Sequence, residues 1–168
     1  QLDVYIRDCG INCISFDMSV LMNNIFTEQY IGTTLLNYRH DTPAPYLDPK
    51  ALAEAIEQAM NREALLNFNI KATGRFQYSI EDVERILESN GYPVKYIETI
   101  HNNQLHKNAG VSADQRLMSD ISDDYALGIY PKISTDLSMF DVISRSLEDF
   151  VEQDSQYFLN LQAGDKNL

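Results

Sequence analysis

The sequence predicts an α/β fold in which helices pack on a parallel sheet. Two observations carry this prediction. Helical and strand-like segments alternate along the chain, and the strand-like segments are short apolar runs typical of strands buried on both faces. With 168 residues, 44% of them hydrophobic, the chain is long enough to form one domain, 1–168, with a substantial core.

The first elements are predicted to be a helix, a strand and a second helix. Residues 2–9 form the first helix, which ends at Gly10 because glycine favours a helix C-terminus. The mostly apolar run 12–16 is the first strand, and 21–30 the second helix. The polar, proline-containing segment 33–45 is predicted to be a loop.

A very short strand at 45–47 is predicted to lead into a helix over 50–61. Asp48 is a favourable N-cap residue, and Pro49 suits the first helical position. This helix carries two apolar rows side by side, which are Leu52, Ile56 and Met60, and Ala51, Ala55 and Ala59. The alanines would allow close packing against a sheet.

The next elements are predicted to be a strand at 65–70, a helix and a strand at 94–97. Ser79 is the predicted N-cap of the helix, and Asp82 at the third helical position resembles a capping box. Gly91 is predicted to end this helix.

The C-terminal third is predicted to be helical. Residues 112–123 are amphipathic, and 137–157 follow a helical pattern with a break near Ser144, where Ser146 provides a fresh N-cap. Residues 158–168 are expected to form a frayed tail.

The composition excludes some classes of function. A net charge of -12 and a pI of about 4.5 argue against nucleic-acid binding, which needs concentrated Lys and Arg. No apolar run approaches the length of a membrane span, so no membrane insertion is expected. Cys9 and Cys13 are expected to be small buried thiols in a reducing, intracellular compartment, and no histidine has ligand spacing to them, so no metal site is expected.

An ordered series of motifs over 5–151 resembles the C-terminal half of the NmrA-like proteins, the atypical branch of the short-chain dehydrogenase/reductases. The series comprises the helix-glycine-strand step at 5–15, Phe68-Asn69-Ile70, Pro93-Val94-Lys95-Tyr96 and Ser146-Leu147-Glu148-Asp149-Phe150-Val151. The resemblance implies the C-terminal part of a Rossmann-like doubly wound parallel sheet with a small, mainly helical substrate cap. Residues 1–70 would be the Rossmann-side elements, and 71–157 the cap and C-terminal helices.

The resemblance also implies where a site would lie. In relatives, the loop after the first strand lies beside the nicotinamide and the substrate, and the region 98–110 belongs to the substrate cap. The residues that would line this site are therefore Asp17, Met18, Ser19, Val20, Asn23, Asn24 and His101. Asp17 stands where the family has Arg, and Asn23 where it has Glu, so the loop departs from the family pattern.

Two functions of different classes follow from this resemblance. The first is the substrate side of an NAD(P)H-dependent oxidoreductase that acts on a small quinone-like or aromatic acceptor and is inactive without an N-terminal half. NADP or NAD would then bind only when that half is present, because the seven glycines are too far apart to form a dinucleotide-binding loop. The second is a non-catalytic regulator, assembly factor or structural subunit, with a partner protein covering an exposed sheet edge.

Overall fold

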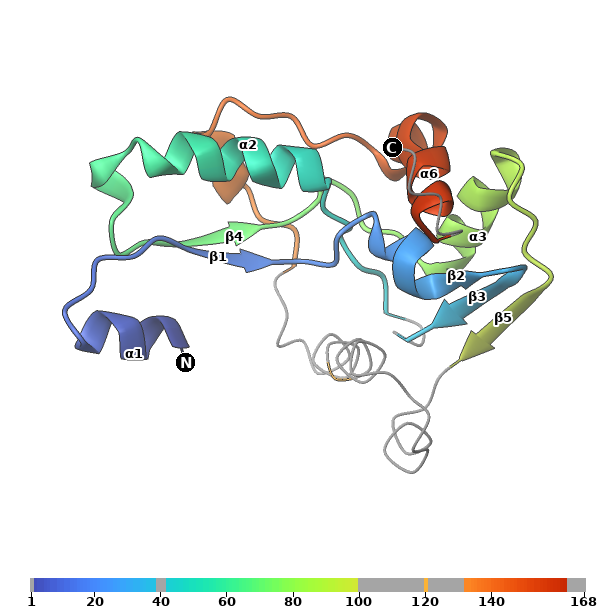
Figure 1. The fold of residues 1–168 in the computed structure, drawn as a ribbon, viewed down its shortest axis with the longest axis horizontal. Coiled ribbons are helices and arrows are strands. Elements are labelled where there is room, and N and C mark those ends of the chain that lie inside the picture. The colour runs from blue at the N-terminus through green and yellow to red at the C-terminus, as the bar shows by residue number, and fades with distance from the viewer. Residues whose placement is uncertain (1, 39–41, 100–119, 121–131, 163–168) are drawn as a thin grey trace.

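The chain folds into a mixed α/β structure with parallel strands, as predicted (Figure 1). The computed structural model describes residues 2–38, 42–99, 120 and 132–162. In these ranges the strands form two separate small sheets rather than one continuous sheet. The predicted helix 112–123 falls outside the described residues, except for Asp120.

The first sheet pairs β1 (Ser15–Met18) with β4 (Asn69–Ala72) in parallel, with Ser15 opposite Asn69 and Met18 opposite Ala72. Both strands begin three or four residues later than predicted. The segments before them are joined by both backbone and side-chain hydrogen bonds: the Asn67 N–H donates to the Cys13 carbonyl at 2.6 Å, and the Cys13 N–H donates to Asn67 Oδ1 at 3.3 Å. Figure 1 shows α2 (Pro49–Met60) lying along this strand pair.

The second sheet corrects the predicted loop 33–45. β2 (Tyr30–Ile31) turns back at Gly32 into β3 (Thr34–Asn37), and β3 pairs in parallel with β5 (Tyr96–Thr99). Gly32 has φ 65°, a conformation that glycine adopts without strain and that a two-residue hairpin turn requires. Strand β5 begins two residues later than predicted.

The predicted helix 21–30 is also wrong in extent. Only a single turn, η1 (Ile25–Gln29), is helical, and it is a π-helical turn. Leu21 instead forms an isolated parallel bridge with Leu47, which accounts for the predicted very short strand at 45–47. The residues between β1 and η1 are therefore held by long-range pairing rather than by local helix formation.

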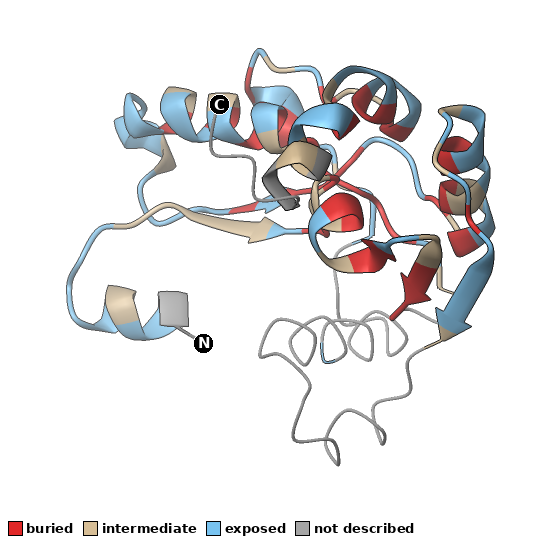
Figure 2. Cartoon of the chain, turned by 45° about the vertical axis from the view of Figure 1, so that its right-hand side comes forward, coloured by how far each residue is buried: buried red, intermediate tan, exposed pale blue. Residues whose placement is uncertain are grey.

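Two hydrophobic clusters hold these elements together. Figure 2 shows where the buried residues lie along the chain. The larger cluster joins η1, β2 and β3 to α3 (Ile80–Ser89) and α6 (Leu147–Gln162). The smaller cluster joins α2 and β4 to η3 (Asp136–Met139), with Ile70 and Ala72 facing the helix. The carboxyl ends of β1 and β4 lead to the region between the two clusters.

Helix α2 buries its alanine row, as its small side chains allow, together with Leu52. The other large residues of the apolar row remain outside: Met60 is 79% exposed and Ile56 is also exposed. The Asp48 carboxylate accepts from the Lys50 N–H at 3.0 Å, so the predicted N-cap is confirmed, with Pro49 at the first helical position.

The predicted N-caps of the two later helices are confirmed. Ser79 and Asp82 form a reciprocal capping box on α3, and Ser146 Oγ accepts from the Asp149 N–H at 3.1 Å at the start of α6. The predicted break in the segment 137–157 is also confirmed, because η3 ends at Met139 and the next helical residue is Leu147. Helix α6 continues to Gln162, five residues into the segment assigned to the frayed tail.

The N-terminal helix α1 (Leu2–Asp8) ends near Gly10, whose φ is 75°. It lies apart from the other described elements in Figures 1 and 2. Cys9 is exposed and Cys13 is half-buried, so the prediction of two buried thiols is wrong. Cys9 is exposed because it directly follows α1, which lies apart from the other described elements.

Candidate functional site

The candidate site begins where β1 and β4 end side by side. In open α/β sheets, ligands bind beyond the carboxyl ends of parallel strands. Ser19 follows β1 directly and Thr73 follows β4, and the Ser19 N–H donates to the Ala72 carbonyl at 2.9 Å. Two loops therefore start next to each other at the edge where this class of fold places its ligands.

The loop after β1 is fixed by backbone hydrogen bonds to the segment that enters α2. The Leu47 N–H donates to the Val20 carbonyl at 2.8 Å, and the Met22 N–H donates to the Leu47 carbonyl at 2.9 Å. The Asn23 carbonyl then accepts from the Phe26 N–H at 3.0 Å, at the start of η1. The loop 19–24 is thus a rigid part of the fold.

Two buried polar atoms of this loop lack a hydrogen-bond partner in the part of the chain that the structure describes. They are the Ser19 hydroxyl and the Asn23 side-chain carbonyl. Ser19 is only 5% exposed. A buried polar atom without a partner costs free energy, so each of these two atoms calls for a partner, such as a bound water, an ion or a ligand.

The other predicted site residues lie around this loop in different environments. Asp17 is half-buried and stands opposite Lys71 in the strand pair, and Met18 is exposed. Val20 is buried in the larger hydrophobic cluster, and Asn24 is the residue before η1. His101 lies outside the described residues.

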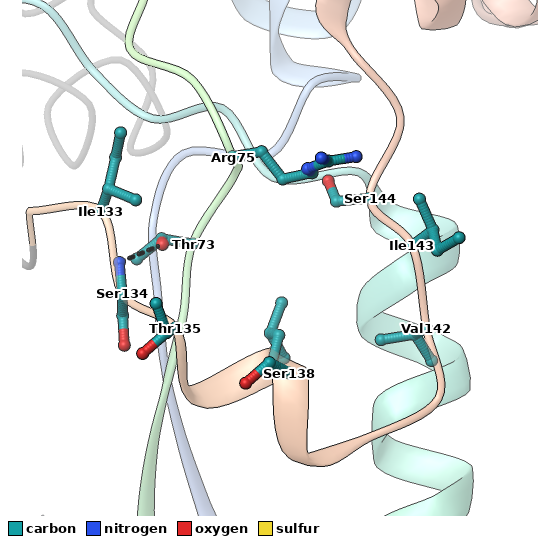
Figure 3. Close-up of a pocket in the computed structure, with 10 residues that line it drawn as sticks. Thr73, Arg75, Ile133, Ser134, Thr135, Ser138, Val142, Ile143 and Ser144 are labelled. Atoms are coloured by element: carbon teal, nitrogen blue, oxygen red, sulfur yellow. Dashed lines mark hydrogen bonds between the residues drawn. The ribbon is translucent and has the colours of Figure 1, made fainter.

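A pocket of about 430 Å³ lies on the β4 side of the same edge, and the sequence analysis did not find it (Figure 3). Its described lining residues come from two segments, Thr73 and Arg75 after β4, and residues 133–144. The Ser134 N–H donates to Thr73 Oγ1 at 2.8 Å and joins the two segments. The position of Thr73 directly after a strand was the only local signal, because the other wall comes from a distant part of the sequence.

An ion pair fixes the far end of the segment 133–145. Arg145 Nε donates to Asp48 Oδ2 at 2.8 Å, and Arg145 Nη2 donates to Asp154 Oδ2 at 2.7 Å. Burial alone would raise the pKa of the Asp48 carboxyl, but hydrogen bonds from the Arg145 side chain and the Lys50 N–H outweigh it and lower the pKa below its ordinary value. Asp48 is therefore held as a carboxylate.

Two searches of the described residues found nothing. Among the residues with described positions, no group of three or more His, Cys, Asp or Glu side chains is arranged to hold a metal ion. No described helix is both long and apolar enough to cross a membrane.

Comparison with solved structures identifies the fold. The chain is similar to a nucleoside-diphosphate-sugar epimerase of Staphylococcus aureus, with a TM-score of 0.70, 15% identity, and coverage of 89% of this chain and 55% of that one. It is similar to the triphenylmethane reductase of Citrobacter sp. complexed with NADP(H), with a TM-score of 0.65, 20% identity, and coverage of 90% and 56%. It is also similar to an NADPH-dependent quinone oxidoreductase of Escherichia coli complexed with NADPH. The TM-score is 0.74 and the identity 13%, and the match covers 93% of this chain and 57% of that one.

These similarities show that the chain shares the α/β fold of these epimerase and reductase structures. The chain spans slightly more than half the length of these structures. The sequence matches no family model and no curated protein. At identities of 13–20%, structural similarity establishes the fold, and it does not establish the activity or the substrate.

Proposed function

We propose that this chain is the substrate-side part of an NmrA-like NAD(P)H-dependent reductase, which acts on a small quinone-like or aromatic acceptor together with an N-terminal nucleotide-binding half. The observation that carries the proposal is the pair of unsatisfied polar atoms, on Ser19 and Asn23, in the loop beyond the β1–β4 edge. The similarity in fold to reductases complexed with NADP(H) or NADPH supports it.

The two atoms have the hydrogen-bonding chemistry that the amide end of a nicotinamide requires. The Ser19 hydroxyl can donate to a carbonyl oxygen, and Asn23 Oδ1 can accept from an amide N–H. No described residues form a glycine-rich cradle for the diphosphate, so this chain would hold only the nicotinamide end.

The chemistry is divided between cofactor and protein. When bound, a reduced nicotinamide supplies a hydride, and reduction of a quinone to a hydroquinone takes up one further proton from water. The Ser19 hydroxyl and the side-chain Oδ1 of Asn23 would orient the amide. The backbone hydrogen bonds of the loop 19–24 keep both side chains in place. Val20 is buried in the larger hydrophobic cluster and anchors the loop there.

A second candidate function is favoured by Asp17. A carboxylate near the end of β1, just before this loop, would repel an anionic cofactor, as expected for a non-catalytic subunit or regulator that retains the fold. The missing binding partner would then be a protein that covers the loop.

One experiment separates these two functions. NADPH is titrated into the protein at its full natural length, and NADPH oxidation is followed with and without 1,4-benzoquinone. The reductase proposal predicts saturable NADPH binding that weakens in Asn23→Leu, and quinone-dependent oxidation. Absence of NADPH binding to the folded natural protein would refute the reductase and favour the subunit.

A further inference from the structure

The pocket beyond β4 has a lining unlike the rest of this acidic chain. Its described lining residues include Arg75 and no carboxylate, although the sequence holds 25 Asp and Glu residues against 13 Lys and Arg. None of the residues of the loop 19–24 lines it. It is therefore a separate feature from the loop on which the reductase proposal rests.

Arg75 is a cation without an anionic partner in the described part of the chain. Its guanidinium lies over the ring of Phe76, with 5.7 Å between the guanidinium carbon and the ring centroid. Figure 3 shows the Arg75 side chain extending across one end of the pocket towards Ser144. Its planar set of N–H donors matches a carboxylate in a two-pronged geometry.

The opposite walls provide an apolar surface with a few hydroxyl groups. The apolar lining residues are Ile133, Leu137, Val142 and Ile143, and Ile143 is 78% exposed. Thr135 and Ser138 add hydroxyls on the η3 side. A volume of about 430 Å³ lies within the range of small-molecule pockets, which are mostly apolar with a few polar anchors.

We propose that this pocket binds a small aromatic carboxylate, with Arg75 contacting the carboxylate and Ile143 and Val142 contacting the ring. The apolar walls favour an organic acid over an inorganic anion, because only an organic acid has an apolar part that can be buried against them. The net charge of -12 opposes anions at long range, but at physiological salt this field is screened beyond about 8 Å, so the local contact with Arg75 decides.

The test is calorimetric titration of the protein at its full natural length, without NADPH, at physiological salt. The probes are 2-naphthoate, its neutral analogue 2-naphthamide and inorganic phosphate. We expect 2-naphthoate to bind at least tenfold more tightly than either of the others.

Variants assign the binding to this pocket. Arg75→Gln is expected to weaken 2-naphthoate binding about tenfold or more, whereas the matched control Arg85→Gln, on α3, leaves it unchanged. Ile143→Ser tests the apolar wall without disturbing the core, since this side chain is largely exposed, and it should weaken binding severalfold. The proposal is overturned if 2-naphthoate does not bind, if phosphate or 2-naphthamide binds equally well, or if Ile143→Ser and a folded Arg75→Gln both bind like the natural protein.

Discussion

The Arg145 guanidinium holds the carboxylate of Asp48 through two hydrogen bonds, with Nε–Oδ2 at 2.8 Å and Nη2–Oδ1 at 3.1 Å. Asp48 caps α2, and Arg145 immediately precedes Ser146, the N-cap of α6. The Asp48 side chain is only 1% exposed. This pair therefore joins the start of α2, in one hydrophobic cluster, to the start of α6, in the other.

We predict that Arg145→Met destabilises the protein by about 3 kcal/mol, because it leaves a buried carboxylate without its cation. The free energy of unfolding in urea measures this change. Arg85→Met is the control, since the Arg85–Asp82 pair is exposed on α3 and its loss should cost less than about 1 kcal/mol. Equal losses in the two variants would contradict the structural role of the Asp48–Arg145 pair.

The same pair predicts an acid-dependent loss of stability. The pKa of Asp48 is lower in the folded state than its ordinary value of 3.8, so its contribution is complete above that pH and is lost as the pH falls through the lower folded-state pKa. Asp48→Asn should remove this contribution. Urea unfolding of both proteins between pH 5 and about 3 should show a smaller difference in stability at the acid end.

Tyr78 predicts the opposite dependence at alkaline pH. Its hydroxyl accepts from the Leu147 N–H at 3.0 Å and donates to the Glu148 carboxylate at 3.2 Å. Burial, together with the negative charge of Glu148, raises its pKa to about 12. A raised folded-state pKa means that the stabilisation is complete below pH 10 and is lost as the pH rises from 10 to about 12.

Tyr78→Phe tests this prediction. Its free energy of unfolding at pH 7 should be lower by about 1–2 kcal/mol, because the Leu147 N–H loses its acceptor. The variant should also lack the loss of stability between pH 10 and 12. Thermal melts across this range, with exposed Tyr96→Phe as control, measure both effects. An unchanged alkaline transition in Tyr78→Phe would show that Tyr78 is not its source.

The same elements show how much the sequence could predict. The capping box of α3 and the N-cap of α2 were predicted correctly, because each depends on residues only two or three positions apart. The fold class was also predictable from alternation alone. Strand boundaries were wrong by two to four residues, because the pairing of Ser15 with Asn69 is set by a distant partner.

The candidate site was harder to predict for the same reason. Ser19 and Asn23 were named from a resemblance, but their lack of partners is visible only in three dimensions. The pocket beyond β4 was missed because Thr73 and Ser134 meet only through folding. The hairpin at Gly32 was missed because the nearby prolines at 43 and 45 suggested a loop.

Gly74 is predicted to tolerate no side chain. A Cβ there would lie 1.8 Å from the Tyr46 carbonyl oxygen, a backbone atom that cannot move aside easily. Gly74→Ala should therefore cost about 3 kcal/mol of unfolding free energy. The control is Gly91→Ala, which has open space but a φ of 84°, and its expected cost is only about 1 kcal/mol. The reverse order of the two losses in urea unfolding would contradict this prediction.

Ser19→Ala is predicted to raise stability and to lower cofactor affinity. Its buried hydroxyl lacks a partner among the described residues, so its removal should stabilise the unliganded protein by about 1 kcal/mol. If the hydroxyl orients a nicotinamide amide, the same change should weaken NADPH binding about tenfold. Urea unfolding and NADPH titration of the natural protein and of the Ser19→Ala variant measure the two effects.

Ser15→Ala is the control, because the Ser15 hydroxyl already donates to the Phe68 carbonyl at 3.4 Å. A loss of stability in Ser19→Ala would show that another group satisfies this hydroxyl in the unliganded protein, and unchanged NADPH binding would remove Ser19 from the site.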